Sequence, residues 1–304
     1  MTLWTHYHTP STIDEALALL ASSQGRARVM AGGTDLLLDI RQGHTPRPDA
    51  LVDITRIADL SRIEQHGDVL VVGAGVTHSQ IVASQDLAAH ATCLVESCGV
   101  VGGPQVRNVG TLGGNVAHAL PAGDGTISLV ALDAGADAVV AGERRWRPIT
   151  EMFLGPGQSL LDQTRDLLIR FRFRLCGPGE ATAFKRIMRP QGVALPILGC
   201  AAWVQLDEPG ERYSDVRVCV GPVAQVPVRA ADVEAALRGQ PVSGETLDRA
   251  VRAAHESLHP RTSKYRATVD YRQEMIEVLL RRVLPLAVQR ARTGQAVPEG
   301  VGME

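Results

Sequence analysis

The chain has 304 residues and a mass of 32.5 kDa, a length that predicts two domains of ordinary size or one large domain. Hydrophobic residues make up 45% of the sequence and charged residues 21%, which excludes a mainly disordered or collagen-like chain. The 31 Lys and Arg residues nearly balance the 33 Asp and Glu residues, giving a net charge of −2. A nucleic-acid partner is therefore not expected, because a polyanion is bound mainly through excess basic charge.

Neither a membrane segment nor a metal site is expected. The longest apolar runs, such as 129–132, fall far short of the roughly 18 residues that cross a bilayer. The N-terminus lacks the basic-then-apolar pattern of a signal peptide, so we expect a cytoplasmic protein without a membrane span. The 5 cysteines are scattered without a Cys-x-x-Cys pair, which favours buried free thiols over disulfides or metal ligands. His6 and His8 would share one strand face, but no further ligand lies nearby in sequence, so a solvated pair is favoured over a metal site.

Helix and strand patterns alternate along the first hundred residues. The expected elements in chain order are a helix capped by Ser11 or Thr12, a strand at 29–31, a helix at 36–42, strands at 51–54 and 69–72, and helices at 77–83 and 87–97. Thr12 and Glu15 have the spacing of a capping box ahead of an apolar stripe. Gly32-Gly33 forms a tight turn after the first strand, and Gly43 is the expected C-cap of the next helix. This part of the chain is therefore mixed α and β.

The chain changes character after residue 100. From 100 to 125 glycine and proline are too dense for continuous helix or sheet, so we expect a long ordered loop, and such loops within compact domains are usually functional. Arg170, Arg172 and Arg174 alternate with two phenylalanines, which predicts a strand with one basic and one apolar face. The later elements are expected as strands at 201–206 and 216–220 and helices at 230–238, 244–258 and 268–283. They form a smaller α+β domain, which we place after a linker at 176–179.

Two glycine-rich segments, 31–35 and 110–115, are the candidate site. Both offer consecutive main-chain N–H groups that no Cβ shields, and such amides near a helix start can hold a diphosphate without a lysine. Either segment alone is better explained as a turn that needs positive φ, because short glycine motifs are common. The occurrence of both shifts the interpretation towards one shared diphosphate site.

Other nucleotide-binding motifs fail on inspection. Gly73-Ala74-Gly75 follows a strand, but His78 stands where the dinucleotide fingerprint requires a glycine. The sequence also has no Gly-Lys-Ser or Gly-Lys-Thr for a P-loop. Neither a Rossmann-type NAD site nor an ATPase is therefore supported.

A family resemblance rests on three segments: Ala-Gly-Gly-Thr-Asp-Leu at 31–36, Gln-Val-Arg-Asn-Val-Gly-Thr-Leu-Gly-Gly-Asn at 105–115, and Leu-Pro-Ala-Gly-Asp at 120–124. Together they resemble the FAD-binding medium subunit of the molybdenum hydroxylases, which include xanthine dehydrogenase and carbon monoxide dehydrogenase. Further matches lie at 153–157, 183–186, 265–267 and 271–272. The resemblance implies an α+β chain. A two-lobed FAD-binding domain of the PCMH type, like that of vanillyl-alcohol oxidase, would span 1–176 and divide near 55–60. A smaller α+β C-terminal domain would span 177–304.

The resemblance also implies which residues hold FAD, with no catalytic side chain and no metal ligand on this chain. The implied contacts are Val29, Ala31, Gly32, Gly33, Thr34, Leu36, Val101, Thr111, Gly113, Gly114, Asn115, Asp124, Leu168 and Lys185, with Asp35 in support. Thr111 and Asn115 would hydrogen-bond phosphate or ribitol, and Asp124 a ribose hydroxyl. Asp35 is expected to hold its loop through backbone N–H groups, because its charge would repel a phosphate.

The same resemblance implies a role in electron transfer. Electrons would leave a substrate at a molybdenum-cofactor large subunit, pass through an iron–sulfur small subunit, and reach NAD or another acceptor through this FAD. The lack of a cysteine array fits that division, because this chain has nothing to ligate a cluster. Two alternatives stay open. One is a self-sufficient FAD-dependent oxidoreductase on a similar fold, for which no clear acid or base is found in the C-terminal part. The other is a non-enzymatic nucleotide-binding assembly module.

Overall fold

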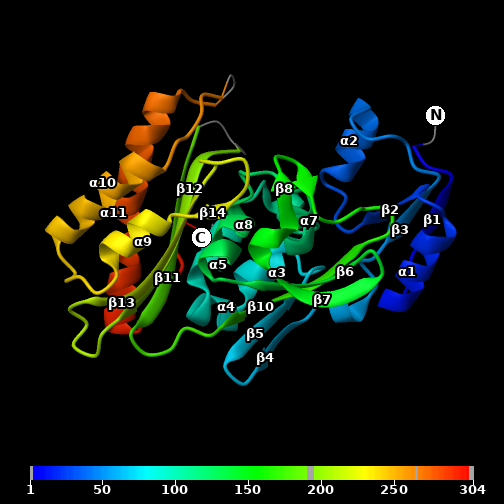
Figure 1. The fold of residues 1–304 in the computed structure, drawn as a ribbon. Coiled ribbons are helices and arrows are strands. Elements are labelled where there is room, and N and C mark those ends of the chain that lie inside the picture. Colours follow the sequence, from blue (N-terminus) through cyan, green and yellow to red (C-terminus); the bar gives the residue numbers. More distant parts are fainter. Residues whose placement is uncertain (1–2, 190–194, 264–265, 301–304) are drawn as a thin grey trace. The chain divides into compact units, whose positions relative to one another are not determined.

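The computed structural model describes residues 3–189, 195–263 and 266–300 of the chain (Figure 1). The chain divides into two compact units, each made from separate stretches of sequence. The first comprises Met1–Gln80, Pro104–Ala119 and Ala134–Phe173, and the second comprises Ile81–Gly103, Leu120–Asp133 and Arg174–Glu304. The chain passes for the last time from the first unit to the second after Phe173. The predicted domain boundary after residue 176 stays a prediction.

The first unit is built from small sheets and short helices. Its sheets have the strand orders β1-β3-β2, with parallel pairing, β4-β5-β10-β6-β7, and β8-β9. The strands are β1 (His6–His8), β2 (Ala27–Met30), β3 (Ala50–Asp53), β4 (Ile63–His66), β5 (Val69–Gly73), β6 (Gly135–Val140), β7 (Glu143–Pro148), β8 (Phe153–Gly155), β9 (Gln158–Ser159) and β10 (Leu167–Arg174). The helices are α1 (Ile13–Ser22), α2 (Leu36–Gln42), η1 (Ala58–Leu60), α6 (Pro104–Arg107), α7 (Leu112–Ala117) and η2 (Ile149–Met152), and α3 (His78–Ala83) leads into the second unit. Apolar residues of α1, β2 and β3 share one core, which fixes the chain where the segment 31–35 leaves β2.

The second unit is a sheet with helices on both faces (Figure 1). Its antiparallel strands, in order, are β11 (Glu180–Met188), β12 (Pro196–Leu206), β13 (Tyr213–Gly221) and β14 (Val228–Arg229). Its helices are α4 (Gln85–His90), α5 (Thr92–Gly99), α8 (Asp124–Ala131), α9 (Ala231–Leu237), α10 (Gly244–Ser257) and α11 (Val269–Thr293). Helices α9 to α11 cover one face, whereas α5 and α8 pack on the other. The mixed architecture predicted from the sequence is confirmed.

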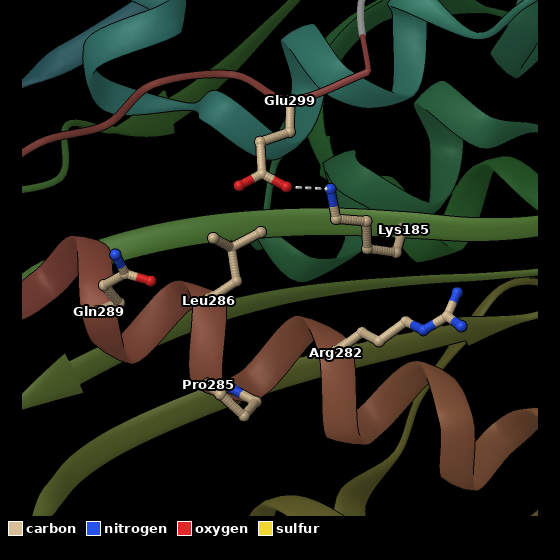
Figure 2. A pocket seen from close by; sticks show the side chains of 6 residues that line it. All are labelled: Lys185, Arg282, Pro285, Leu286, Gln289 and Glu299. Atoms are coloured by element: carbon tan, nitrogen blue, oxygen red, sulfur yellow. Dashed lines mark hydrogen bonds and ion pairs between the residues drawn. The ribbon is translucent and has the colours of Figure 1, made fainter.

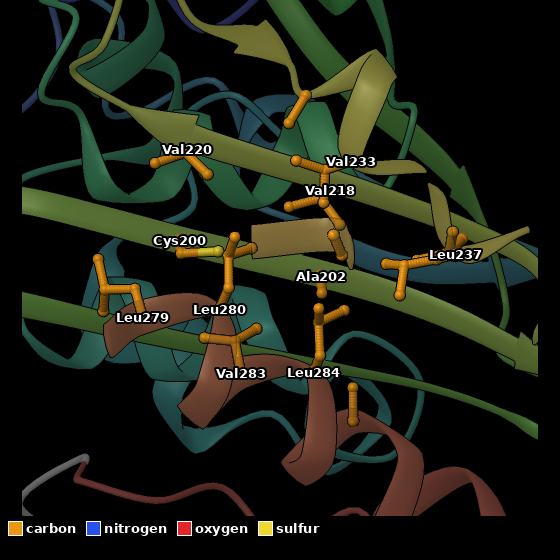
Figure 3. Packing of buried hydrophobic residues seen from close by; sticks show 14 of the residues in the cluster. Cys200, Ala202, Val218, Val220, Val233, Leu237, Leu279, Leu280, Val283 and Leu284 are labelled. Atoms are coloured by element: carbon orange, nitrogen blue, oxygen red, sulfur yellow. The ribbon is translucent and has the colours of Figure 1, made fainter. Parts of the chain in front are cut away.

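An apolar core of the second unit lies between its sheet and α11 (Figure 3). Cys200 of β12 belongs to the same buried cluster as Leu280 and Leu284 of α11. Alternate residues of a strand point to opposite faces, and a Cβ on Gly199 would stand 3.1 Å from Ile127 of α8. Strand β12 is therefore buried on both faces, which explains its continuous apolar sequence.

Local sequence signals set several element boundaries as predicted. The hydroxyl of Thr12 accepts the N–H of Glu15 at 3.1 Å, and the Glu15 carboxylate accepts the N–H of Ser11 at 2.7 Å. The Thr12 bond is the predicted half of the capping box, whereas the Glu15 carboxylate reaches Ser11, one residue before the N-cap, and not the N–H of Thr12. Gly43 ends α2 with a φ of 77°, a left-handed conformation that glycine adopts without strain. Strand β10 has the predicted faces, since its two phenylalanines are buried and its arginines alternate with them.

Two predicted segments differ from the structure. The single helix predicted at 87–97 is divided into α4 and α5, because Ala91 leaves the helical region with φ −146° and ψ 46°. The predicted loop from 100 to 125 contains α6 and α7 and the start of α8. Helix α7 forms despite its two glycines because Thr111 caps it through a side-chain hydrogen bond. Averaging the glycine content over a long segment cannot predict short helices of this kind.

One helix is longer than the sequence predicts, and several strands are not predicted from the sequence. Helix α11 continues to Thr293 with Pro285 in its interior, whereas the prediction ended it at 283. Strands β6, β7 and β11 were not predicted. Strand β7 has a polar sequence because four of its six residues face solvent. An alternating pattern is therefore weak there, since alternation depends on one buried face.

The five cysteines are all buried and free, as expected from their spacing. Burial raises the pKa of Cys93 and of Cys200 to about 12, so these thiols stay protonated at neutral pH. His6 and His8 lie on β1 with ring centroids 6.3 Å apart. Within the described ranges, no group of three or more His, Cys, Asp or Glu side chains is placed to hold a metal ion. The helices of those ranges include none with the length and apolar character needed to cross a membrane.

A buried ion pair ties α5 to α11 within the second unit. Glu96 Oε1 lies 2.6 Å from Arg290 Nη2, and the two side chains are 1% and 3% exposed. Glu96 Oε2 accepts the N–H of Phe184, and Arg290 Nη1 donates to the carbonyl oxygen of Thr182. Both charges are thus hydrogen-bonded, which a buried ion pair requires. Glu96 Oε1 also accepts the N–H of Glu299 at 2.9 Å, so the pair holds the segment that follows α11.

Replacing Glu96 with glutamine should lower the free energy of unfolding by about 3–5 kcal/mol, because Arg290 would stay buried without a counter-charge. The control is Asp215→Asn. Asp215 lies 2.8 Å from Arg238, but the two side chains are 34% and 46% exposed, so this change should cost less than about 1 kcal/mol. Urea unfolding measures both. Equal costs would show that the buried pair does not stabilise the packing of α5 and α11.

Candidate functional site

The first glycine segment, residues 31–35, joins β2 to α2 in the first unit. Gly33 has a φ of 67°, the left-handed conformation that occurs in turns whose successive N–H groups bind anions. Among the described residues, the N–H groups of Gly32, Gly33 and Thr34 have no hydrogen-bond partner. Three consecutive unpaired N–H groups can donate to an anion such as a phosphate. The predicted main-chain donors are therefore present in this segment.

The second glycine segment uses its N–H groups internally. The N–H of Gly113 donates to the carbonyl oxygen of Ala74 at 2.8 Å, and that of Gly114 to the hydroxyl of Thr111 at 3.0 Å. A Cβ on Gly113 would stand 2.5 Å from the Ala74 oxygen, so glycine is needed there for close packing. Gly113 and Gly114 thus lack the free N–H groups expected of a main-chain clamp. Among the described residues, the run of three consecutive unpaired N–H groups lies on the first segment.

The two glycine segments lie against each other within the first unit. A Cβ on Gly32 would stand 2.0 Å from the carbonyl oxygen of Val109 and 2.9 Å from Cα of Gly110. Real Cβ atoms do not come this close to another atom, so only glycine allows this contact. The turn at Val109 and Gly110 leads directly into Thr111 and α7. The free N–H groups of residues 32–34 and the start of α7 therefore belong to one place in the fold.

Asp35 does not take the expected capping role. In the described part of the chain its carboxylate accepts no backbone N–H of α2. It accepts the hydroxyl of Thr34 at 3.4 Å instead, and its Oδ1 lies 3.9 Å from His118 Nε2. The contact with His118, which follows α7, brings the start of α2 and the end of α7 together. Asp35 therefore supports the site without using the N–H groups of the first segment.

His78 positions the second segment. Its N–H donates to the carbonyl oxygen of Gly110 at 3.0 Å, and its ring is 3% exposed. Cδ2 of the ring is 3.4 Å from the position of a Cβ on Gly110. Burial and, to a smaller extent, the charge of Arg107 lower the pKa of His78 to about 4. His78 is therefore neutral at pH 7 and acts as a packing residue.

Asp124 is a predicted cofactor residue whose pKa is strongly raised. It begins α8 in the second unit and is 3% exposed. Its Oδ2 lies 2.8 Å from Arg186 Nη1, whereas its Oδ1 has no hydrogen-bond partner among the described residues. Burial raises the pKa of Asp124 to about 7 against the opposing charges of Arg186 and Arg266. A buried carboxylate oxygen in this state can accept a ligand hydroxyl.

Lys185 is half-buried on β11, and its Nζ lies 2.6 Å from Oε2 of Glu299. This ion pair stands at the edge of a groove of about 510 Å³ (Figure 2). The other residues that line the groove come from α11: Arg282, Pro285, Leu286 and Gln289. Lys185 is therefore paired with another residue of the second unit. Val101 also belongs to the second unit, whereas Leu168 is buried in β10 of the first unit. Cofactor contacts of these three residues stay predictions.

Comparison with known proteins identifies the family. Residues 3–173 match the family described as "FAD binding domain in molybdopterin dehydrogenase". Residues 182–287 match the "CO dehydrogenase flavoprotein C-terminal domain". The chain is an FAD-binding medium subunit of the molybdenum hydroxylase family. The resemblance seen in the glycine segments is thereby confirmed, and FAD is the cofactor of this class of subunit.

Relatives and solved structures match this medium subunit along nearly its whole length. The xanthine dehydrogenase FAD-binding subunit of Escherichia coli O157:H7 is 29% identical, over 94% of this chain and 96% of the relative. The carbon monoxide dehydrogenase medium chain of Hydrogenophaga pseudoflava is also 29% identical, over 93% and 97%. A solved carbon monoxide dehydrogenase from the same organism superimposes with a TM-score of 0.87 at 30% identity, covering 94% of this chain and 98% of that one. Quinoline 2-oxidoreductase from Pseudomonas putida 86 gives 0.85 at 26% identity, covering 95% and 98%.

Two residues that the sequence did not single out form ion pairs with predicted cofactor residues in the structure. Arg186 pairs with Asp124 across 62 positions of sequence, and Glu299 pairs with Lys185 across 114. Arg186 stands in the matched segment 183–186, so the family pattern was a usable signal for it. No signal in the sequence indicated Glu299, because an isolated acidic residue near the end of a chain is common on any surface.

Replacing Gly32 with alanine should lower the free energy of unfolding by about 2 kcal/mol or more, because the new Cβ would overlap the Val109 oxygen and force the two segments apart. Gly244→Ala is the control, since a Cβ there meets no heavy atom within 4 Å. Urea unfolding followed by circular dichroism compares the two variants. A Gly32→Ala protein as stable as the control would contradict the close contact between the segments.

Asp124 should make the protein less stable as pH rises. Its folded pKa of about 7 lies above its ordinary value of 3.8, so the folded state binds the proton more tightly than the unfolded state. The contribution of this group to stability is therefore highest below 3.8 and falls as pH rises to about 7. The free energy of unfolding of Asp124→Asn, measured in urea and expressed relative to wild type, should therefore increase as pH rises from 5 to 8. A difference that does not change with pH would refute the raised pKa.

Proposed function

We propose that this medium subunit takes electrons from an iron–sulfur partner and passes them through bound FAD to an acceptor such as NAD. The observation that carries the proposal is the first glycine segment. Its N–H groups at Gly32, Gly33 and Thr34 are unpaired among the described residues, and its Gly32 lies against Val109. Family membership supplies the cofactor, and this geometry fits the diphosphate of FAD.

The chain's own residues bind and orient the cofactor in this proposal. The N–H groups of residues 32–34 donate to the diphosphate, and the exposed Gly114 leaves the start of α7 open to it. Asp124 accepts a ribose hydroxyl through Oδ1, which has no hydrogen-bond partner in the described part of the chain. FAD, when bound, accepts and releases electrons one or two at a time. The further contacts predicted from the family are Val29, Ala31, Leu36, Val101, Thr111, Gly113, Asn115, Leu168 and Lys185.

The names of the relatives support a multi-subunit enzyme. One is called a FAD-binding subunit and another a medium chain of a dehydrogenase. We infer that this chain works with a molybdenum-cofactor large subunit and an iron–sulfur small subunit. The five buried and scattered cysteines are compatible with this arrangement, because they do not form a cluster-binding set. NAD as the acceptor and a cytoplasmic location are part of the proposal.

Flavin titration tests the binding part of the proposal. FAD-free protein should bind FAD in a 1:1 ratio and at least about 100-fold more tightly than riboflavin, because only FAD carries a diphosphate for the charge-assisted N–H bonds. Gly32→Ala should weaken FAD binding at least about tenfold, whereas Gly244→Ala should bind as wild type does. Equal affinity for FAD and riboflavin would refute the diphosphate site. A protein that takes up no flavin would support the assembly-module alternative instead.

The electron-transfer part is tested on the assembled enzyme. Purification from the native source should recover this chain with a molybdenum-containing chain and an iron–sulfur chain. Rapid mixing of that complex with its substrate should reduce the iron–sulfur centres before the flavin absorbance falls. Full activity of this polypeptide alone would favour a self-sufficient oxidoreductase and end the partner proposal.

A further inference from the structure

One face of the sheet β4-β5-β10-β6-β7 in the first unit changes from apolar to basic along β6. Val139, Asp137 and Gly135 of β6 share this face, because alternate residues of a strand point to the same side. Val139 belongs to the apolar core that also contains Ala16 and Leu20 of α1. Towards the other end of β6, the side chains that lie over Asp137 and Gly135 are those of arginines and a tryptophan.

Three arginines and Trp146 meet on this part of the sheet. Asp137, whose side chain is 3% exposed, accepts Arg144 Nη2 at 2.8 Å and Arg170 Nε at 3.0 Å. The guanidinium carbon of Arg172 stands 4.2 Å from the ring centroid of Trp146, and that of Arg170 stands 5.6 Å from it. The four side chains of Arg144, Trp146, Arg170 and Arg172 are called the arginine–tryptophan face below.

Gly135 allows Arg172 and Trp146 to lie directly on the sheet. A Cβ on Gly135 would stand 3.4 Å from Arg172 Nε and 3.4 Å from Trp146 Cε3. The two side chains therefore occupy the space over the backbone of β6, where they also stack on each other. Side chains that are already ordered lose little conformational freedom when another molecule binds, which favours association.

Protection of a sheet edge does not explain this face. Strand β7 lies at the edge of its sheet, and exposed charges on such a strand prevent pairing with another chain. Strand β10, however, is the central strand of the five. Its Arg172 is exposed, and the side chain of its Arg170 is 39% exposed. The middle of the sheet is thus open to another molecule at these two positions.

The arginine–tryptophan face carries excess positive charge. Asp137 is shared by two of its arginines, and Arg172 makes no ion pair within the described part of the chain. The charges of Asp14 and Asp59 act on Arg144, but less than that of Asp137 does. Tryptophan and arginine are the residue types enriched among those that contribute most to binding at protein interfaces. Their positive charge here is complementary to an acidic surface.

We propose that the arginine–tryptophan face docks an acidic patch on a partner subunit of the assembled enzyme. Trp146 and Arg172 supply a stacked contact area, while Arg144 and Arg170 supply charge and are held in place by Asp137. The inference rests on the proposed function, because that function requires a partner, and it identifies the surface and the charge that the partner has to match. None of the four side chains is among the predicted cofactor contacts. The face can therefore be altered without changing FAD binding.

The test uses tagged full-length chains purified from the native source, with the molybdenum-containing and iron–sulfur chains measured as molybdenum and iron per mole of tagged chain. Arg172→Glu should lower the recovered metal at least about tenfold relative to wild type, because it reverses a charge within the interface. Trp146→Ala should lower it several-fold without changing any charge, and it serves as the second variant if Arg172→Glu does not fold. Bound FAD per chain, measured by visible absorbance, should be equal in all of them and reports correct folding.

Arg145→Glu is the matched control. Arg145 precedes Trp146 on β7 and its side chain is 57% exposed, but the alternation of the strand places it on the opposite face of the sheet. The same reversal of charge at this position should leave the recovery of both partner chains as in wild type.

Three results would overturn the proposal. One is an Arg172→Glu chain that recovers both partners as wild type does, and another is an equal loss in Arg145→Glu. The third is an Arg172→Glu chain that keeps its partners but loses self-association in gel filtration, which would assign the face to a second copy of this chain. A wild-type chain that recovers neither partner would contradict the proposed function itself. That failure is seen before any variant is compared, so the two failures are distinguishable.

Discussion

The candidate site of the first unit depends on the close approach of two main-chain segments. The carbonyl of Val109 occupies the space where a side chain at position 32 would begin, and Gly113 is held in the same way against Ala74. These contacts involve backbone atoms, which cannot move aside as the end of a flexible side chain can. They fix the turn at residues 32–34 before any ligand binds. Its unpaired N–H groups are therefore preorganised, and a ligand need not order the loop.

Two buried ion pairs of the second unit differ in how completely their atoms are hydrogen-bonded. Glu96 and Arg290 satisfy each other and also bond to backbone groups of β11 and of the segment after α11. Asp124 and Arg186 are nearly as buried, yet each keeps an atom without a partner among the described residues. Complete pairing is what structural stability requires, and incomplete pairing is common where a ligand completes the set. Burial alone would not have distinguished a structural pair from a candidate binding pair.

Local signals made much of the fold predictable. The Thr12 cap of α1 and the glycine end of α2 involve neighbouring residues, so sequence spacing suffices to find them. The break at Ala91 and the short helices between 100 and 125 depend on tertiary packing, because every residue of α5 is buried. The glycine segments are visible in the sequence, but which of their N–H groups are free is not. Whether a glycine N–H is free or already bonded depends on a distant carbonyl such as that of Ala74.

The distribution of thiols has a practical consequence for dissecting this molecule. All five cysteines are buried and unpaired, and every one of them belongs to the second unit. A thiol reagent can react with them only when their surroundings open. Labelling kinetics thus reports the opening of the second unit and does not detect the opening of the unit with the glycine segments. Native cysteines already provide a unit-specific probe, without any engineered label.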